Sequence, residues 1–200
     1  MDYDIFKSIN DFTSRHDGIE DILSFIAQDA HYIFVALLTA LFLVPTRWGS
    51  PNLRRGVVAA AVAAGVALLV AHGITILWDR PRPFVAHPHY THLLISHGTD
   101  PSFPSDHATG AFAIAVSLLL RSRRVGWFAL AFAVVVAFAR VAVGVHYPSD
   151  VLGGALIGTA AALLVWQPPV RSRLDRLSDT VGYQYERVAG RALGTPVGAS

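Results

Sequence analysis

Residues 56–77 read GVVAAAVAAGVALLVAHGITIL, a stretch that contains no aspartate, glutamate, lysine or arginine. A helix of about 20 apolar residues is long enough to cross the hydrocarbon core of a bilayer. The stretch is rich in alanine, leucine and valine, and it lacks the strict alternation that is typical of a transmembrane β-strand. It therefore predicts a membrane-spanning α-helix.

Four further apolar runs flank this one, and they cover residues 19–44, 107–120, 125–145 and 151–166. Hydrophobic residues make up 53% of the 200-residue chain and charged residues only 15%, whereas a soluble domain carries about 25% charged residues. A chain of this length cannot bury so much apolar surface in one aqueous core. We predict an all-α fold, a polytopic membrane helix bundle with about five spanning helices.

Most of the arginines gather in three short segments between and after the runs, at residues 47–55, 121–124 and 171–176. These segments contain Arg47, Arg54, Arg55, Arg121, Arg123, Arg124, Arg171, Arg173 and Arg176. If the helices alternate in direction, all three segments fall on one face, which the positive-inside rule makes cytoplasmic. The loops 78–106 and 146–150 then face the extracytoplasmic side. Because the formal net charge is only +2 and the arginines are confined to these segments, we expect no nucleic-acid partner.

Both ends of the chain repeat apolar residues at helical spacing among polar ones. Residues 1–18 therefore predict an amphipathic interfacial segment, and residues 169–200 predict a cytoplasmic amphipathic tail. Residues 19–168 form the predicted membrane-embedded core. A short soluble cap is the alternative for each flank.

One polar cluster on the predicted extracytoplasmic face runs from His146 to Asp150. Pro148 disfavours helix at the residue before it, so one helix should end near His146 and the next should carry Asp150 in its first turn. The two side chains can then face each other. A carboxylate bound to one imidazole nitrogen leaves the other nitrogen free to attack. The alternative is a simple capping pair, since an aspartate in a first turn is stabilised by the helix dipole.

A second cluster on the same face starts the run at residue 107. Ser105 is a plausible N-cap that places Asp106 and His107 in the first helical turn. The backbone N–H groups of such a turn form an anion site, aided by the dipole. His107 could donate a proton to whatever binds there. An ordinary cap followed by a packing face is the alternative.

Three arginines complete the polar residues of this face. Arg80 and Arg82 alternate with prolines in a stiff segment, which suits guanidinium groups that bind phosphate oxygens, although pairing with lipid headgroups is the alternative. Arg140 lies inside an apolar run, where an unpaired charge would be costly. We expect Asp150 or a bound phosphate as its anionic partner.

Two histidines, three arginines and a helix N-terminus are the components of phosphoryl transfer through a phosphohistidine. Positioning and charge stabilisation provide most of the catalysis in such chemistry. The sequence shows neither an array of magnesium-binding carboxylates nor a glycine loop for phosphate, and it contains no cysteine. We therefore expect no cofactor and no metal, with the arginines in the metal's role.

These residues resemble the motifs of the type-2 phosphatidic-acid phosphatase superfamily, which are K-x6-R-P, P-S-G-H and S-R-x5-H-x3-D. The matching positions are Arg82-Pro83, then Pro104-Ser105-Asp106-His107, then Arg140, His146 and Asp150. Within that superfamily, RPFVAH at 82–87 and FPSDHATGA at 103–111 look most like the bacitracin-resistance type of undecaprenyl-diphosphatase. The likeness covers nearly the whole chain.

The resemblance implies that His146 is the nucleophile, Asp150 its orienting partner and His107 the general acid. It also implies that the phosphate is bound by Arg82, Arg140 and Ser105. Three positions depart from the motifs, since Thr75 replaces the lysine, Asp106 the glycine and Ala139 the serine. We expect Arg80 to supply the missing charge and Asp106 to face Arg80 or water, so both are included among the phosphate-binding candidates.

The implied reaction is hydrolysis of undecaprenyl diphosphate to undecaprenyl phosphate and phosphate, which recycles the lipid carrier of cell-wall synthesis. The expected partners are a polyprenyl diphosphate and membrane lipids, in a bacterial plasma membrane with the active site on the extracytoplasmic side. The alternatives are a phosphatase acting on phosphatidylglycerophosphate, phosphatidate or diacylglycerol diphosphate, and a non-catalytic lipid carrier. A further alternative is a zinc- or copper-binding module built from His87, His89, His92 and His97.

Overall fold

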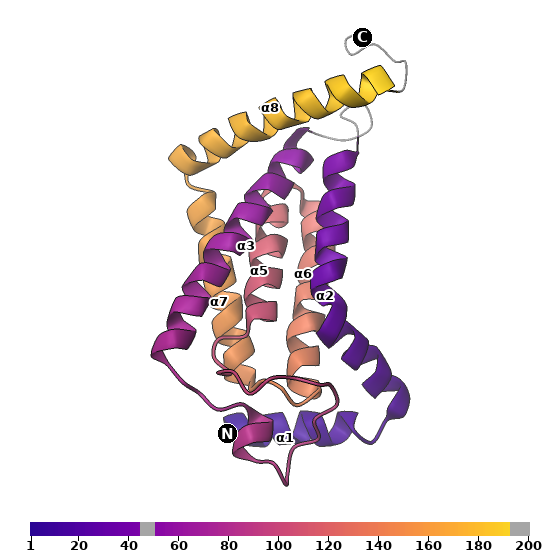
Figure 1. Ribbon diagram of the computed structural model, residues 1–200, viewed down its shortest axis with the longest axis vertical. Helices are drawn as coiled ribbons and strands as arrows, with labels where there is room; N and C mark the ends of the chain where they lie inside the picture. Colours follow the sequence, from indigo (N-terminus) through magenta and orange to yellow (C-terminus); the bar gives the residue numbers. More distant parts are fainter. Residues whose placement is uncertain (45–50, 193–200) are drawn as a thin grey trace.

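In the computed structural model, five long helices run side by side along the long axis of the protein (Figure 1). The structure describes residues 1–44 and 51–192. The helices are α1 (Asp2–Thr13), α2 (Asp17–Leu43), α3 (Pro51–Leu77), α4 (Pro83–Ala86), α5 (Asp106–Arg121), α6 (Arg123–Ala142), α7 (Pro148–Val165) and α8 (Pro168–Ala192). No strand occurs in these ranges, and the predicted all-α class is confirmed. The predictions for Arg47 and for residues 193–200 lie outside the described residues.

Within the described part of the chain, four helices are long and apolar enough to cross a membrane, namely α2, α3, α6 and α7. With 16 residues, α5 is shorter than the roughly 20 residues that a span requires. It lies at the centre of the bundle and packs against α3, α6 and α7 (Figure 1). Its neighbours rather than lipid therefore cover much of its surface, which explains how a short helix that begins with two polar residues can occupy this position.

Glycine allows α7 to approach α5 closely. A side-chain carbon at Gly154 would lie 2.6 Å from the carbonyl oxygen of Ser105, and one at Gly158 would lie 2.3 Å from that of Thr109. This close approach brings the N-termini of the two helices together, and the Ser105 N–H donates to the carbonyl oxygen of Asp150 at 3.1 Å. Two of the predicted polar clusters are thereby joined.

Helix α8 crosses one end of the bundle (Figure 1). Three ion pairs connect α8 with the rest of the bundle, namely Arg54–Glu186, Arg55–Asp179 and Arg121–Asp175. Arginines from two of the predicted cytoplasmic segments thus meet α8 at the same end, as expected if alternate loops share a face.

Helix α1 crosses the opposite end, beside the loop 78–105 (Figure 1). Its buried side includes Phe6 and Asn10. The Asn10 Nδ2 donates to the carbonyl oxygens of His92 and Ala142 at 2.8 Å each, and the His92 N–H donates back to Asn10 Oδ1 at 2.8 Å. In this way α1 connects the loop with the end of α6, next to the predicted site.

Candidate active site

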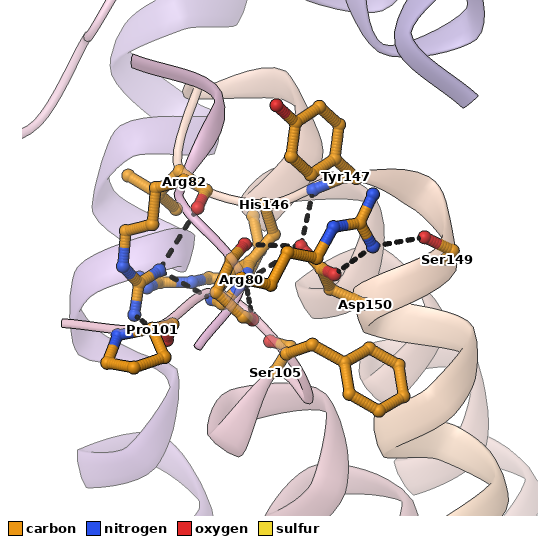
Figure 2. A network of polar contacts seen from close by, with 12 residues as sticks. Arg80, Arg82, Pro101, Ser105, His146, Tyr147, Ser149 and Asp150 are labelled. Carbon is orange, nitrogen blue, oxygen red and sulfur yellow. Dashed lines mark hydrogen bonds and ion pairs between the residues drawn. The ribbon is translucent and has the colours of Figure 1, made fainter. Parts of the chain in front are cut away.

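His146 lies in the short corner between α6 and α7, and it is only 2% exposed. Its Nδ1 is 2.9 Å from the carbonyl oxygen of Ser102, and its Nε2 is 3.1 Å from Nη1 of Arg82 (Figure 2). A carbonyl oxygen can only accept a hydrogen bond, so Nδ1 carries the proton of the neutral ring. Nε2 therefore keeps its lone pair, which a nucleophilic imidazole requires.

Asp150 is fully buried in the first turn of α7. Its Oδ2 accepts from the backbone N–H of Tyr147 at 2.8 Å and from the Ser102 hydroxyl, while its Oδ1 accepts from Arg80 Nη1 at 2.6 Å. The distance from Oδ2 to Nδ1 of His146 is 3.5 Å. The closest acceptor of the imidazole proton is thus the Ser102 carbonyl rather than the predicted carboxylate. The capping role that the sequence left as an alternative is present, and the carboxylate also stands beside the ring.

Arg82 precedes the short helix α4 and is 4% exposed. Its Nε donates to the carbonyl oxygen of Asp100 at 2.8 Å, its Nη1 to that of Val145 at 3.0 Å, and its Nη2 to the Asp100 carboxylate at 2.7 Å. These bonds hold the guanidinium with its Nη1 beside Nε2 of His146. The unprotonated Nε2 of His146 therefore accepts a hydrogen bond from a fixed cation.

Arg140 is also buried, near the end of α6. Its Nη1 donates to the carbonyl oxygen of Ala27 at 2.9 Å, and its Nη2 lies 2.8 Å from Nε2 of His97. The expected partner Asp150 is instead bound by other groups, because the cap of α7 and Arg80 occupy its oxygens. Arg140 is thus held by neutral acceptors.

Three of the predicted residues have a buried polar atom without a hydrogen-bond partner. Ser105 is the N-cap of α5, as predicted, but its hydroxyl makes no capping bond. Among the described residues, the buried side-chain atoms without a hydrogen-bond partner include Ser105 Oγ, His107 Nε2 and Arg140 Nε. His107 lies close enough to Arg140 for the charge of the guanidinium to act on it. Because buried polar atoms are nearly always paired, these atoms fit a ligand with several acceptor oxygens.

Arg80 is bound to carboxylates, and Asp106 lies close enough to Arg82 and Arg140 for their charges to act on it. Arg80 donates to Asp150 at 2.6 Å and to Asp2 of α1 at 2.7 Å. Figure 2 shows its side chain directed at Ser149 and Asp150. Asp106 is exposed in the first turn of α5, which agrees with the expectation that it faces water if it does not face Arg80.

The two remaining departures from the family motifs introduce no charge. The Thr75 hydroxyl donates to the carbonyl oxygen of Ala71 at 3.0 Å and lies 3.4 Å from that of Phe103. Ala139 is fully buried in α6. Both side chains therefore belong to the packing behind the site.

The electrostatics of the corner and the loop favour a neutral imidazole beside fixed cations. Burial, followed by the charges of Arg140 and Arg82, lowers the pKa of His146 well below its usual value. Burial also lowers the pKa of His97. Burial raises the pKa of Asp100, but the hydrogen bond and charge of Arg82 outweigh this, so the net shift is downward. Nε2 of His146 is therefore unprotonated at neutral pH, and Asp100 is ionised.

Sequence reasoning missed most of the residues that surround the site. Ser102, Asp100 and Asp2 were not singled out, and His97 was considered only as a metal ligand. Within residues 1–44 and 51–192, no group of three or more His, Cys, Asp or Glu side chains could hold a metal ion. Asp100 and Ser102 lie just ahead of the Phe-Pro-Ser motif, and that proximity was the one available signal for them.

An all-α membrane bundle with a buried imidazole, two buried arginines and a helix N-terminus at one end defines a class, the helical membrane proteins with a buried histidine–arginine site. The sequence model of the PAP2 superfamily matches residues 56–173, a range that includes every predicted site residue. The chain belongs to the PAP2 superfamily.

Similar proteins agree with this assignment. The undecaprenyl-diphosphatase BcrC of Bacillus subtilis (strain 168) is 36% identical over 196 residues, which cover 98% of this chain and 97% of that protein. The bacitracin transport permease protein BcrC of Bacillus licheniformis is 32% identical, with 96% of this chain and 91% of that protein covered. The crystal structure of Aquifex aeolicus LpxE has the same fold, with a TM-score of 0.69 and 24% identity over 82% of this chain and 94% of that chain. This protein is therefore a multi-span bacterial membrane protein with the PAP2 fold.

Proposed function

We propose that this protein is a membrane-bound lipid diphosphatase that hydrolyses undecaprenyl diphosphate to undecaprenyl phosphate and phosphate. The single observation that carries the proposal is the Nε2 of His146, unprotonated and 3.1 Å from a buried arginine. The Bacillus subtilis relative, which matches nearly the whole chain and is named an undecaprenyl-diphosphatase, supports the choice of substrate.

The phosphate-binding role is assigned to Arg82, Arg140 and Ser105. The unpaired Arg140 Nε and Ser105 Oγ can both donate to phosphate oxygens, as can the N–H groups at the start of α5. The guanidinium of Arg82 already lies beside the attacking nitrogen. Fixed donors of this kind stabilise the charge that develops on the transferring phosphoryl group.

The proposed reaction has two steps. Nε2 of His146 attacks the terminal phosphorus, the bond to the bridging oxygen breaks, and His107 donates its proton to the oxygen of the departing undecaprenyl phosphate. An anionic diphosphate beside His107 favours the protonated imidazole that this step needs. In the second step water attacks the phosphohistidine, gives a proton to His107 and releases inorganic phosphate.

The test is phosphate release from polyprenyl diphosphate by the purified protein, with and without EDTA. We expect turnover in both conditions, because the arginines provide the positive charge. His146→Asn should abolish both turnover and a trapped phosphohistidine, and His107→Asn should abolish turnover. Retained turnover in either variant would remove its proposed role, and loss in EDTA that a divalent ion restores would point to a metal enzyme. A panel with phosphatidate, phosphatidylglycerophosphate and diacylglycerol diphosphate defines the lipid preference.

The active site is assigned to the extracytoplasmic side of the membrane. The arginine segments gather at the α8 end, and His146 lies at the other end with α1. The positive-inside rule then places α8 in the cytoplasm. The lipid diphosphate would reach the site from the outer leaflet.

A further inference from the structure

The side of Asp150 that faces away from His146 is held by a chain of charged groups that ends on α1. Arg80 donates from Nη1 to Asp150 Oδ1 at 2.6 Å and from Nη2 to Asp2 Oδ2 at 2.7 Å. The side chain of Asp150 is fully buried, that of Arg80 is 24% exposed and that of Asp2 is 34% exposed. This series of charged groups therefore leads from the interior of the site to its surface. Each terminal nitrogen of Arg80 donates to one of the two carboxylates.

Two neighbours fix the guanidinium further. The Ser149 hydroxyl accepts from Arg80 Nη1 at 2.6 Å and donates to Asp2 Oδ2 at 2.6 Å, and the Ser149 N–H donates to Asp2 Oδ1 at 3.1 Å. The guanidinium carbon lies 4.2 Å from the ring centroid of Tyr147, a cation–π contact. Figure 2 shows Arg80 between these side chains. Its position is thus determined by the protein alone.

The two outer groups of this series, Arg80 and Asp2, carry opposite charges. Burial raises the pKa of Asp2, but the hydrogen bonds from Ser149 and Arg80 outweigh this and the net shift is downward, so Asp2 is anionic at neutral pH. Arg80 therefore lies between two carboxylates. Removing the cation would leave the buried carboxylate of Asp150 without its charged partner, which is a costly arrangement.

Ser102 links Asp150 to His146, the proposed nucleophile, because it is hydrogen-bonded to both. The Ser102 hydroxyl donates to Asp150 Oδ2, and the carbonyl oxygen of the same residue accepts the proton of His146 Nδ1 at 2.9 Å. Displacing the carboxylate would therefore move the acceptor that orients the imidazole. The orientation of the ring depends on groups that no phosphate contacts.

We infer that Arg80 is a positioning residue for Asp150 and His146 rather than a phosphate ligand, and that Asp2 makes α1 part of the catalytic unit. The inference rests on the proposed function. It replaces the expectation that Arg80 supplies the charge missing at Thr75. A phosphate ligand directs its donors at the phosphate, whereas three of the five N–H donors of Arg80, from both terminal nitrogens, are directed at Asp2, Ser149 and Asp150.

The test uses the full-length protein in detergent with Asp2→Asn, Arg80→Gln and the double variant. The measured quantities are kcat, KM for polyprenyl diphosphate and the inhibition constant of inorganic phosphate. We expect each single variant to lower kcat by about 10- to 100-fold, the value of a charge-assisted hydrogen bond. KM and the inhibition constant should stay near the wild-type values, since only the chemical step is affected. The double variant should be no worse than Arg80→Gln, because Asp2 acts through Arg80.

The matched control is Asp4→Asn on the same helix. The Asp4 carboxylate is 80% exposed and pairs with the chain's N-terminal ammonium, so wild-type kinetics are expected. If Arg80→Gln does not fold, Arg80→Lys answers the same question, because an ammonium cannot bridge both carboxylates as the planar guanidinium does. A lowered kcat in Arg80→Lys supports the inference, and a wild-type kcat overturns it.

Two further outcomes would overturn the inference. A large rise in the inhibition constant of phosphate with kcat retained would make Arg80 a phosphate ligand, and unchanged kinetics in Asp2→Asn would separate α1 from catalysis. In both cases the wild-type protein is active and the proposed function stands. A wild-type protein that releases no phosphate from polyprenyl diphosphate would instead refute the proposed function, and the inference with it.

Discussion

Two imidazoles in the site have the same hydrogen-bond arrangement. His146 and His97 each present Nδ1 to a backbone carbonyl oxygen and Nε2 to an arginine, which is Arg82 for the first and Arg140 for the second. An arginine cannot give up its proton in a protein, so each ring must accept and stays neutral. A phosphate that draws these arginine donors to its own oxygens would release both lone pairs, and only that of His146 is proposed to attack.

His97 orients Arg140, and its removal should weaken substrate binding. In His97→Ala the Nη2 of Arg140 loses its acceptor, so we expect KM to rise about 10-fold, the value of one hydrogen bond to a charged group, with a smaller effect on kcat. Steady-state kinetics measure this. His89→Ala is the control, because His89 is exposed in the same loop. Equal KM values in the two variants would contradict the role of His97.

The lowered pKa of His146 predicts a contribution to stability that depends on pH. The unfolded ring titrates near 6.5, and the native ring titrates well below that value. Between these two values the unfolded chain binds more protons, so this contribution is complete above about pH 7 and is lost as the pH falls below 6.5. The thermal unfolding midpoint of the wild type should therefore drop more steeply from pH 7 to pH 5 than that of His146→Asn. Parallel curves would show that His146 titrates normally.

At the residue scale, the sequence predicted which side chains lie near one another better than it predicted their hydrogen-bond partners. The four-residue spacing of His146 and Asp150 brought them to one corner, and Pro148 begins α7 as expected. The preceding helix α6 ends at Ala142 rather than near His146, because the chain turns at Gly144, whose φ is +91°. The partners of Arg140 and the acceptor for His146 come from residues far away in the chain, such as Ala27 and Ser102. No periodicity or local spacing encodes such contacts.

At the scale of elements, the α5–α7 seam determines whether the site assembles. Gly154 and Gly158 allow the two helix backbones to approach, and the N-termini that meet at the end of the seam carry Ser105 and Asp150. The seam and the site are therefore one structural unit. A substitution that separates α5 from α7 along the seam should therefore displace Ser105 and Asp150 at its polar end.

Gly158→Ala tests this connection. The added methyl group would lie 2.3 Å from the Thr109 carbonyl oxygen and 2.8 Å from the Ala113 nitrogen, so the helices must separate. We expect a loss of about 1–3 kcal/mol in stability, the usual cost of overpacking, with reduced activity. Thermal unfolding and phosphate release measure the two effects.

The matched substitution is Gly65→Ala in α3, where the added carbon meets nothing within 4 Å. It should leave activity unchanged and stabilise the helix by about 0.5–1 kcal/mol, because alanine is the better helix former. Equal effects of the two substitutions would show that the seam does not depend on close approach.

The elements themselves were largely predictable. Each apolar run corresponds to a helix, because a chain in lipid must satisfy its backbone hydrogen bonds internally. The length of α5 and the contacts of α1 were not predictable, since both depend on packing. α5 can be short because other helices surround it, and α1 is held by Asn10, which bonds to residues more than 80 positions away.

At the scale of the whole molecule, the bundle has two different ends. α8 covers one end through arginine–carboxylate pairs, and α1 with the loop 78–105 covers the other (Figure 1). The proposed site belongs to the α1 end. The two ends should therefore be reachable from opposite sides of the membrane.

The absence of cysteine from the sequence makes this orientation easy to test. His89→Cys places a thiol in the exposed loop near α1, and Ser172→Cys places one on α8. A membrane-impermeant maleimide added to intact cells should label the first variant, whereas the second should react only after the membrane is opened. Labelling in the reverse order would put the active site in the cytoplasm.

The shortness of α5 has a consequence for the depth of the reaction. Its 16 residues rise about 24 Å, against about 30 Å for the hydrocarbon layer. If Arg121, whose partner Asp175 belongs to α8, lies at one headgroup boundary, the Ser105 end of the helix stops short of the other boundary. The proposed site would then lie several ångströms below the lipid headgroups. The diphosphate of the proposed substrate would have to descend into the bilayer while its polyprenyl tail stays dissolved in the surrounding acyl chains.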